Sequence, residues 1–374
     1  MQTRKFGNLN FDSSILGFGT MRLPVIGGDS SKIDEDQAIA MIRYAIDHGV
    51  NYVDSAHGYH GGNSEVVTGK ALSGGYRERV KIATKQPPWS VHKASDMDRL
   101  LDQQLQRLQT NKIDVYLLHC LSKSFWQKLS GFGVVKWAEN MIAKGRIGGL
   151  GFSAHETCDD FCSLIDAYDG WAMCQIQYNY LDQENQAGTR GLLYAGSKGV
   201  PVVAMEPLRG GRLAEPPAAV RAVFDGVPAR RSPVEWALRW VWNHPEIKVA
   251  LSGMSRMAQV KENLAIAERF APMTADESAV IDRAVVEFEK AFPVACTACG
   301  YCMPCPKGVN IPRVFDVYNQ SVLYADLGVP RYTYGLIPAS QRADQCAECH
   351  ECEPKCPQKI AIPQELAAAH KRLG

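Results

Sequence analysis

The sequence predicts an α/β fold, a (β/α)8 TIM barrel with an N-terminal hairpin, followed by a small α-rich domain that binds metal. Two observations support this prediction. From residue 14 to about residue 270, eight short apolar or β-branched runs alternate with longer stretches of helical period. Beyond residue 290, eight of the 12 cysteines form two tight clusters, a placement that disagrees with a dispersed disulfide framework and indicates metal.

Composition excludes several classes of function. The 374 residues include 41 Lys+Arg and 40 Asp+Glu, so the formal net charge is +1 and no basic excess favours nucleic acid or an anionic membrane. The longest apolar runs have the length of strands rather than of membrane spans. The first residues lack the apolar run of a secretory signal. We therefore expect a cytoplasmic protein with no nucleic-acid and no membrane partner.

The elements of the barrel follow in order. Residues 1–12 predict a hairpin with Gly7-Asn8-Leu9-Asn10 at its turn. The eight predicted strands are residues 15–19, 52–55, 80–84, 115–119, 148–153, 174–178, 200–205 and 249–252. Residues 35–47 and 97–108 carry apolar stripes at helical spacing, and a helix over 275–290 ends the barrel. We place the first domain at 1–290 and the second at 291–374.

A doubly wound sheet is the alternative fold, but no G-x-G-x-x-G motif opens the first helix. The longest gap between a predicted strand and its helix runs from Pro207 to Pro233 and is rich in Gly, Pro and Arg. At the C-terminal mouth of a barrel, such a loop is either a lid or cofactor clamp, or a solvated connection whose arginines confer solubility. Both interpretations remain open.

The cysteine clusters have the spacing of iron-sulfur ligands. The first is Cys296-x-x-Cys299-x-x-Cys302-x-x-Cys305-Pro306, and the second is Cys346-x-x-Cys349-x-x-Cys352-x-x-x-Cys356-Pro357. The second matches the bacterial ferredoxin run, in which three close thiolates bind one cubane and the fourth binds the other. This rule groups Cys296, Cys299 and Cys302 with Cys356, and Cys346, Cys349 and Cys352 with Cys305. The first run is one residue shorter, which makes Cys305 the least typical ligand.

The stretch after each last cysteine repeats, with Val309-x-Ile311-Pro312 in the first half and Ile360-x-Ile362-Pro363 in the second. Two equivalent half-modules are typical of ferredoxin-type domains. The tail therefore resembles a two-cluster 4Fe-4S ferredoxin domain with a long insert over residues 307–345. Two structural zinc sites of four cysteines each are the alternative, although zinc ribbons usually space their cysteine pairs by many residues.

Polar residues lie at the ends of successive predicted strands. The run Tyr52-Val53-Asp54-Ser55-Ala56-His57-Gly58-Tyr59 ends the second strand with Asp and places Tyr five residues later; Ile82-Ala83-Thr84-Lys85 and Tyr116-Leu117-Leu118-His119 end the next two. This pattern resembles the aldo/keto reductase family over residues 4 to about 290, and the tail resembles the ferredoxin-like extension of one branch of that family. The resemblance implies a catalytic tetrad of Asp54, Tyr59, Lys85 and His119 at the C-terminal mouth.

The chemistry of these four side chains follows from their types. Hydride addition to a carbonyl develops negative charge on the oxygen, so a group must deliver a proton there. A Tyr phenol has a pKa of about 10, and we expect the Lys85 ammonium to lower the pKa of Tyr59. Asp54 is expected to hold Lys85 by an ion pair, and His119, as a neutral ring, to orient the carbonyl by a hydrogen bond.

The resemblance also implies residues that bind NAD or NADP. Ser153 and Gln175 match the contacts to the nicotinamide carboxamide. Met205 stands where many members stack an aromatic ring on the nicotinamide, so stacking is weaker in this chain.

Near the eighth strand, the turn Gly253-Met254-Ser255-Arg256 opens a helix and can place backbone N–H groups on a phosphate. By the same resemblance, Glu262 and Asn263 match residues on the adenosine side. Gln259 stands where many NADP-preferring members have Arg, and Arg256 is a candidate replacement. The choice between NAD and NADP is therefore open.

The remaining cysteines have no assigned chemistry. By strand alternation Cys120 faces away from His119 and packs in the core. Cys158 and Cys162 are spaced i, i+4 on a predicted helix.

The sequence thus predicts an NAD(P)-dependent oxidoreductase of the aldo/keto reductase type that reduces a carbonyl or oxidises an alcohol, with Tyr59 as proton donor. It carries two 4Fe-4S clusters for electron transfer or structure. Its partners are a small-molecule carbonyl or alcohol substrate and an electron-transfer protein. One alternative is a ferredoxin-linked redox enzyme whose clusters, rather than nicotinamide, exchange electrons. Another is an electron-transfer adaptor with the barrel as scaffold, against which the complete tetrad argues.

Overall fold

The computed structural model describes residues 1–7, 9–296, 300–323 and 327–374. It divides into two compact units. The first comprises Met1–Leu213 and Arg231–Ser278, and the second comprises Ala214–Arg230 and Ala279–Gly374. The sequence-based boundary at residue 290 stays a prediction.

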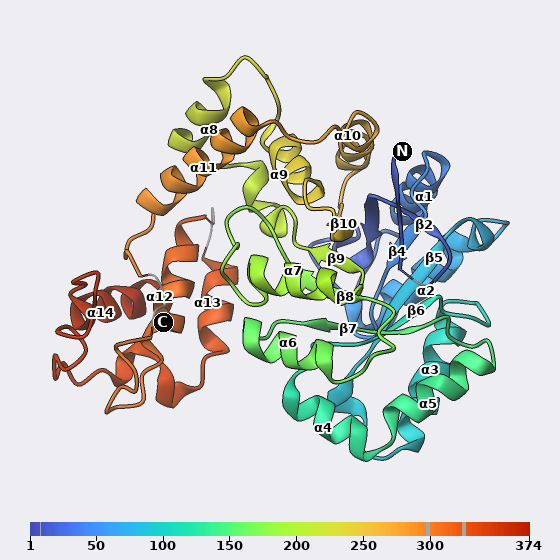
Figure 1. Ribbon diagram of the computed structural model, residues 1–374, viewed down its shortest axis with the longest axis horizontal. Coiled ribbons are helices and arrows are strands. Elements are labelled where there is room, and N and C mark those ends of the chain that lie inside the picture. Colours follow the sequence, from blue (N-terminus) through green and yellow to red (C-terminus); the bar gives the residue numbers. More distant parts are fainter. Residues whose placement is uncertain (8, 297–299, 324–326) are drawn as a thin grey trace. The chain divides into compact units, whose positions relative to one another are not determined.

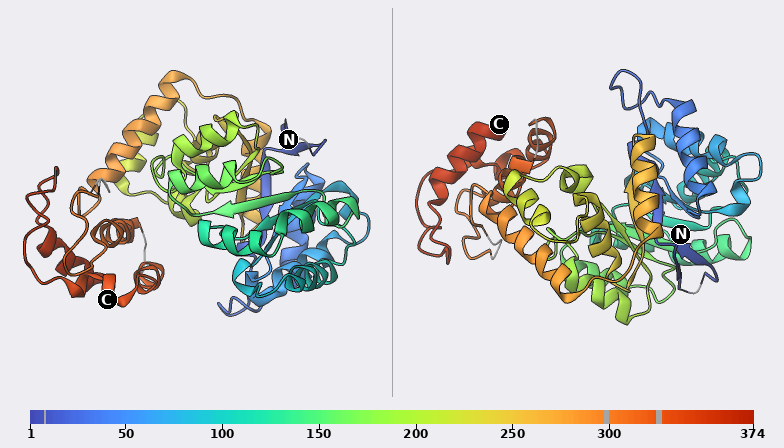
Figure 2. Two further views of the ribbon diagram at one scale, coloured as in Figure 1. Left: turned by 60° about the horizontal axis from the view of Figure 1, so that its bottom comes forward. Right: turned by 90° about the horizontal axis from the view of Figure 1, so that it is seen from above.

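The first unit is a closed barrel of eight parallel strands, as the alternating runs predict, and its helices surround the strands (Figures 1 and 2). The strands are β3 (Leu16–Gly19), β4 (Tyr52–Asp54), β5 (Lys81–Gln86), β6 (Val115–Leu118), β7 (Leu150–Ala154), β8 (Cys174–Gln177), β9 (Val202–Met205) and β10 (Ile247–Gly253). Each strand pairs with its neighbour in sequence, and β10 closes the ring on β3. The (β/α)8 prediction is confirmed.

The N-terminal hairpin is confirmed as well. Strands β1 (Thr3–Lys5) and β2 (Asp12–Ser14) pair antiparallel; of the predicted turn, Asn8 lies outside the described residues. Phe6 follows β1, is fully buried, and stacks on Tyr52 with 5.7 Å between ring centroids. Because Tyr52 begins β4 and Asp54 ends it, the hairpin covers the N-terminal end of the barrel and leaves the C-terminal end for the site.

Amphipathic helices cover the barrel. They are α1 (Glu35–Asp47), α2 (Asn63–Leu72), α3 (Ser95–Arg107), α4 (Lys123–Gly131), α5 (Val134–Ala143), α6 (Cys158–Asp166), α7 (Gly188–Ser197), α9 (Pro233–Trp242) and α10 (Met257–Glu268). Helix α1 has the bounds that its apolar stripe predicts, and its Asp34 cap accepts a hydrogen bond from the Gln37 N–H at 3.1 Å. The helix predicted over 97–108 begins two residues earlier, as α3.

The gap from Pro207 to Pro233 is more structured than either loop interpretation expects. It contains a short 3-10 helix (Arg209–Ala214) and helix α8 (Ala218–Asp225), and α8 belongs to the second unit. Arg209 is buried and pairs with Asp182 at 3.0 Å. This arginine therefore holds the first unit together instead of facing solvent.

The second unit is built from helices, as predicted. Besides α8 it contains most of α11 (Ala275–Lys290), and α12 (Ile311–Gln320), α13 (Gly328–Gly335) and α14 (Ile362–Leu373). A single apolar core joins α12, α13 and α14, with Phe315, Tyr334 and Leu366 among its buried members. No helix in the described part of the chain is both long and apolar enough to cross a lipid bilayer.

The internal repeat of the tail is also a structural repeat. Helices α12 and α14 begin at matching positions of the repeated segment, Ile311 and Ile362, with Pro second in both. Before each helix, a residue with left-handed backbone follows the last cysteine at the same spacing: Gly308 has φ 79° and Lys359 has φ 53°. Their N–H groups donate to the carbonyls of Cys305 (2.9 Å) and Cys356 (3.1 Å). The two halves therefore present their last cysteines on equivalent turns.

Candidate functional site

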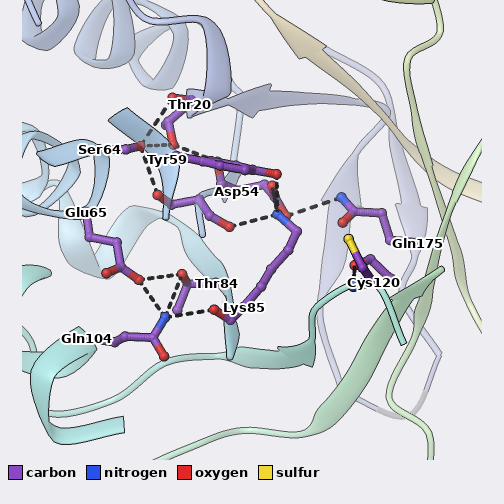
Figure 3. A network of polar contacts seen from close by, with 12 residues as sticks. Thr20, Asp54, Tyr59, Ser64, Glu65, Thr84, Lys85, Gln104, Cys120 and Gln175 are labelled. Atoms are coloured by element: carbon purple, nitrogen blue, oxygen red, sulfur yellow. Dashed lines mark hydrogen bonds and ion pairs between the residues drawn. The ribbon is translucent and has the colours of Figure 1, made fainter. Parts of the chain in front are cut away.

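The four predicted tetrad residues come together at the C-terminal end of the barrel. Asp54 ends β4, Lys85 lies near the end of β5, and His119 directly follows β6. Tyr59 opens a short 3-10 helix (Tyr59–Gly62) in the connection after β4. Figure 3 shows Tyr59, Asp54 and Lys85 pointing toward one another.

Lys85 is the centre of this arrangement. Its Nζ is buried and donates to Asp54 Oδ1, to the carbonyl oxygen of Ser55 at 2.7 Å and to the hydroxyl of Tyr59 at 3.3 Å. All three ammonium hydrogens thus have acceptors. Burial by itself lowers the pKa of Lys85, but the charges and hydrogen bonds of Asp54 and Tyr59 outweigh burial and raise it. Lys85 is therefore a fixed cation beside the phenol.

Tyr59 departs from the expectation in one respect. Its pKa lies above the usual value, because burial raises it more than the Lys85 ammonium lowers it. The expected net lowering is wrong, since the sequence does not reveal how deeply the phenol is buried. The Lys85 contribution has the expected sign. The consequence is a phenol that keeps its proton at neutral pH and faces a cation able to stabilise the phenolate.

His119 packs its ring against the edge of Tyr59, with 6.0 Å between centroids and 81° between planes. Burial, followed by the charge of Lys85, lowers the pKa of His119 to about 3. Its buried Nδ1 finds no hydrogen-bond partner among the described residues. A neutral ring with an unused nitrogen beside the phenol can bind a carbonyl oxygen or another polar atom of a ligand.

A buried polar network, which the sequence analysis missed, supports the tetrad from below (Figure 3). The carboxylate of Glu65 accepts from Thr84 Oγ1 at 2.7 Å and from Gln104 Nε2 at 2.6 Å, and the same Gln104 nitrogen lies 3.1 Å from the carbonyl oxygen of Lys85. On the other side, Thr20 Oγ1 donates to the Asp54 carbonyl at 3.0 Å. These bonds fix the backbone from which Asp54 and Lys85 project. The sequence offered one sign of this network, the polar pair Ser64-Glu65 that follows Tyr59.

Two further residues belong to this mouth. Cys120 is half-buried and has a left-handed backbone, with φ 48°, so the strand alternation that placed it in the core ends before it, at Leu118. Figure 3 shows Cys120 in the site instead, and the core-packing prediction is wrong. The Trp89 ring lies tilted by 43° against the His119 ring, with 5.4 Å between centroids, and Trp89 is 47% exposed. Its place just after β5, in Pro87-Pro88-Trp89, was a signal that the sequence analysis did not use.

The residues expected around a nicotinamide lie on adjoining strands. Gln175, on β8, is buried; its Nε2 donates to Asp54 Oδ2 at 3.3 Å, and its Oε1 has no partner in the described chain. Ser153, on β7, accepts a hydrogen bond from the Cys120 N–H at 3.0 Å, which leaves its own hydroxyl hydrogen available to donate. A buried acceptor and a nearby hydroxyl donor fit a carboxamide, which offers both an NH2 group and a carbonyl. Met205, at the end of β9, adds a partly exposed thioether.

The loop expected near a phosphate is already hydrogen-bonded. Gln259, in the first turn of α10, turns back so that its Oε1 accepts from the N–H groups of Ser255 (2.8 Å) and Arg256 (3.2 Å). It also accepts from the hydroxyl of Ser255 at 3.3 Å. The backbone donors that the turn Gly253–Arg256 was expected to offer are therefore directed at Gln259 itself.

The adenosine-side residues further along α10 also have partners in the protein. Glu262 Oε1 accepts from Ser232 Oγ at 3.0 Å, and the buried Asn263 donates to Ser252 Oγ at 3.0 Å. Met254 is buried, whereas Gly253 and Arg256 are exposed. All of the residues predicted for the phosphate and adenosine side therefore lie between the end of β10 and the middle of α10.

The second unit holds two cysteine-lined cavities. One is lined by Cys296, Cys302 and Cys356 together with mostly apolar side chains; Cys299, the fourth member expected here, lies outside the described residues. The other is lined by Cys305, Cys346, Cys349 and Cys352. This grouping joins each last cysteine to the run of the other half, as the ferredoxin rule expects.

The chemistry of this donor set fits iron-sulfur clusters. Within the described ranges, no three His, Cys, Asp or Glu side chains converge closely enough to hold one metal ion. The thiols instead stand around cavities whose other walls are mostly apolar, such as Ile311, which lines both. A cubane carries its irons at its corners, so its thiolates surround a volume, whereas a tetrahedral zinc site brings four sulfurs to one point. The cavities therefore favour clusters over the zinc alternative.

Comparison with known proteins assigns both parts. The model of the aldo/keto reductase family matches residues 15–286, nearly the whole barrel. The chain belongs to the aldo/keto reductase family. The model of a 4Fe-4S dicluster domain matches residues 295–361, so this aldo/keto reductase is an oxidoreductase with a C-terminal 4Fe-4S domain.

Known relatives cover the aldo/keto reductase part. A methylglyoxal reductase of Escherichia coli is 28% identical over 287 residues, which are 71% of this chain and 92% of that protein. An L-galactose dehydrogenase of Arabidopsis thaliana is also 28% identical over 287 residues, 71% of this chain and 88% of that protein. Among solved structures, an aldo-keto reductase from Klebsiella pneumoniae in complex with NADPH has a TM-score of 0.63 at 27% identity, covering 75% of this chain and 94% of that one.

Proposed function

We propose that this aldo/keto reductase transfers hydride between NAD(P) and a small carbonyl or alcohol, with Tyr59 as the proton donor. The observation that carries the proposal is the Tyr59 hydroxyl, which lies 3.3 Å from a buried Lys85 ammonium and packs against a neutral His119. A protonated phenol, a fixed cation and an uncharged hydrogen-bonding ring are the three groups that carbonyl reduction requires.

A bound nicotinamide supplies the hydride. The chain's own residues supply the rest. Tyr59 gives its proton to the carbonyl oxygen as negative charge develops there, and Lys85 stabilises the phenolate that remains. Asp54 keeps Lys85 charged and in place. His119 orients the carbonyl, and its low pKa keeps the ring neutral, so that it adds no second positive charge beside Lys85. For alcohol oxidation the same groups act in reverse.

The residues present suit the nicotinamide ring. Gln175 Oε1, buried without a protein partner, is the acceptor for the carboxamide NH2, and the Ser153 hydroxyl is the donor for its carbonyl. Met205, at the end of β9, would offer the ring an apolar contact rather than an aromatic stack. The Klebsiella pneumoniae relative was solved in complex with NADPH, which supports a nicotinamide cofactor for this chain.

We further propose that Gln259 favours NAD over NADP. An additional phosphate on the adenosine ribose needs hydrogen-bond donors, and a helix N-terminus is the usual source. Here the N–H groups of Ser255 and Arg256 are directed to the Gln259 oxygen at 2.8 and 3.2 Å. Binding NADP must break these bonds and move Gln259, whereas NAD leaves them intact.

For the second unit we propose two 4Fe-4S clusters, one for each cysteine-lined cavity. Cys296, Cys299, Cys302 and Cys356 would hold one, and Cys305, Cys346, Cys349 and Cys352 the other. The clusters either exchange electrons with a protein partner or stabilise the fold of the tail. Thiolates available for clusters require a reducing environment, which supports a cytoplasmic location.

Anaerobic titration of the iron-loaded protein with NADH and NADPH, followed by addition of small aldehydes including methylglyoxal, tests the hydride-transfer proposal. The relative from Escherichia coli is a methylglyoxal reductase by name. Saturable quenching of Trp fluorescence and oxidation of the nicotinamide on aldehyde addition are the expected results. Absence of binding of either nucleotide would reject the proposal.

A second candidate is a ferredoxin-linked enzyme in which the clusters deliver the electrons. The thioether of Met205, in place of an aromatic ring, and the two cysteine-lined cavities in the tail favour it. In this case the clusters, once reduced by dithionite, would be reoxidised by substrate without any nucleotide, and visible absorbance would report it.

A further inference from the structure

Outside the candidate site, the barrel carries a pair of thiols with an asymmetric environment. Cys158 is the first residue of α6, and Cys162 lies one turn later on the same face. Their sulfur atoms are 3.9 Å apart, and both side chains are half-buried, so that small molecules reach them. The hydrogen bonds of these thiols in the described part of the chain involve each other and Arg190 rather than the tetrad, and neither thiol belongs to the cysteine runs of the tail.

A guanidinium stands next to one of the two thiols. Arg190, on α7, donates its Nε–H to the Cys158 sulfur at 3.0 Å, while its Nη2 is held by Asp159 at 2.6 Å. A cation that donates to sulfur stabilises a thiolate over a thiol, and the first turn of a helix does the same. The nearby carboxylates are themselves paired, Asp159 with Arg190 and Asp160 with Lys123.

The other thiol is kept protonated. Burial and the neighbouring Cys158 raise the pKa of Cys162 to about 11. The pair therefore joins a thiol that faces a cation to a second thiol that is protonated at neutral pH. Such a division into attacking and resolving thiols is what two-step oxidation to a disulfide requires.

We propose that Cys158 and Cys162 form a peroxide-reactive dithiol, with Cys158 as the attacking and Cys162 as the resolving thiol. The Cys158 thiolate attacks a peroxide oxygen; the S–O bond forms, the O–O bond breaks, and hydroxide leaves and takes up a proton as water. The Cys162 sulfur then attacks Cys158, the S–S bond forms, the S–O bond breaks, and a second water leaves with the Cys162 proton. Two electrons pass from the sulfurs to hydrogen peroxide.

Helix geometry permits this product at a modest distortion. Residues four apart in an α-helix have Cα atoms about 6 Å apart, within the range of about 4.4 to 6.8 Å that disulfides span. The sulfurs must close from 3.9 Å to about 2 Å. Because Cys158 is in the first turn, only the end of α6 has to move, and helix ends are the easiest part to displace. The proposal does not rest on nicotinamide binding or on the clusters.

The test uses the full-length, iron-loaded protein with one equivalent of hydrogen peroxide, followed by denaturation, alkylation and chymotrypsin digestion. Phe161 lies between the two cysteines, so cleavage after it leaves two peptides that only a disulfide holds together. We expect this linked pair in the mass spectrum and its loss on reduction. Finding Cys158 and Cys162 both alkylated, or Cys158 as sulfinic acid with Cys162 still a thiol, would overturn the proposal.

Three variants assign the roles. Cys162→Ser should stop at a Cys158 sulfenic acid that dimedone captures, and Cys158→Ser should give no sulfenic acid at Cys162. Arg190→Gln should slow the reaction by about fivefold, since an exposed cation is partly screened. Lys198→Gln is the matched control, because Lys198 follows α7 and pairs with Asp166 at 2.8 Å without touching either sulfur. Equal rates in Arg190→Gln and Lys198→Gln would refute the role of Arg190.

Discussion

Replacing Tyr59 by Phe tests the central chemical assignment. The substitution removes one oxygen and keeps the ring, so the edge contact with His119 at 6.0 Å persists. In the ground state the protein loses one hydrogen bond from Lys85, 3.3 Å long, which contributes about 1 kcal/mol to stability. Lys85 keeps its bonds to Asp54 and to the Ser55 carbonyl. We therefore expect a folded variant with an unchanged affinity for nicotinamide.

The loss in the transition state is much larger. A phenolate 3.3 Å from the Lys85 ammonium is stabilised by about 5 kcal/mol at an effective dielectric constant of about 20. Only part of the phenolate charge has developed when the hydride arrives, so the activation barrier of the Tyr59→Phe variant rises by less than this full interaction energy. General acid catalysis usually contributes about 10²- to 10⁴-fold, or roughly 3 to 5 kcal/mol, which agrees with that limit. We expect kcat to fall by this factor.

The assay is single-turnover oxidation of bound NADH by a small aldehyde, followed by absorbance, with Tm measured alongside. Tyr76→Phe is the matched control, because its hydroxyl bonds to Asp47 at 3.1 Å on the surface and its removal should leave kcat unchanged. A Tyr59→Phe variant that turns over within about threefold of wild type would show that the phenol is not the proton donor. A loss of activity that is fully explained by a matching loss of nicotinamide affinity would lead to the same conclusion.

Three further predictions follow from the geometry. Cys305→Ser combined with Cys346→Ser should remove one cluster and leave about four irons per chain. Cys305→Ser combined with Cys296→Ser should remove both clusters. The reverse pattern in iron analysis would exclude the crossed ligand grouping. Because the pKa of His119 is lowered to about 3, this ring is neutral at every pH above that value, so its protonation should leave kcat/KM flat from pH 5 to pH 8; a step near pH 6.5 that vanishes in His119→Gln would contradict the neutral ring. Gln259→Ala should free the Ser255 and Arg256 N–H groups and raise the affinity for NADPH relative to NADH by roughly tenfold. This is about the contribution of one or two hydrogen bonds to a charged group. An unchanged ratio of the two affinities in calorimetry would refute the role of Gln259.

The sequence reveals those features that depend on periodicity and spacing. Eight apolar runs were enough to predict eight strands, and the stripe over 35–47 predicted α1 with its bounds. The sequence analysis did not predict short elements in stretches rich in Pro and Gly. Helix α8 lies in such a stretch, although its buried residues Val220 and Phe224 are one helical turn apart. The cysteine spacing predicted which thiols share a cavity, because the ferredoxin rule depends on local chain geometry alone.

Properties set by burial could not be read from the sequence. The pKa of Tyr59 depends on desolvation that only the closed barrel determines, and this reversed the expected direction. Cys120 was misplaced because one left-handed residue, with φ 48°, resets the alternation after β6. Gln259 is different, since a Gln at the third position of a helix often bonds back to the N-terminal residue. That signal was present in Arg256-Met257-Ala258-Gln259 and identifies the bond that Gln259 makes to the Arg256 N–H.

Proton and electron sources have to be assigned separately in this protein. In the mechanism that we propose, a carbonyl oxygen that gains electrons in the barrel takes its proton from Tyr59 whether the electrons come from nicotinamide or from a cluster, so Tyr59→Phe tests only the proton source. An enzyme fed by clusters needs no nucleotide discrimination from Gln259, whose bonds to Ser255 and Arg256 then only cap α10. Nor does it need the Gln175 Oε1, which is buried with no hydrogen-bond partner in the described part of the chain. A buried acceptor without a partner costs stability unless a ligand satisfies it. Gln175 thus favours nicotinamide as the electron source for the barrel.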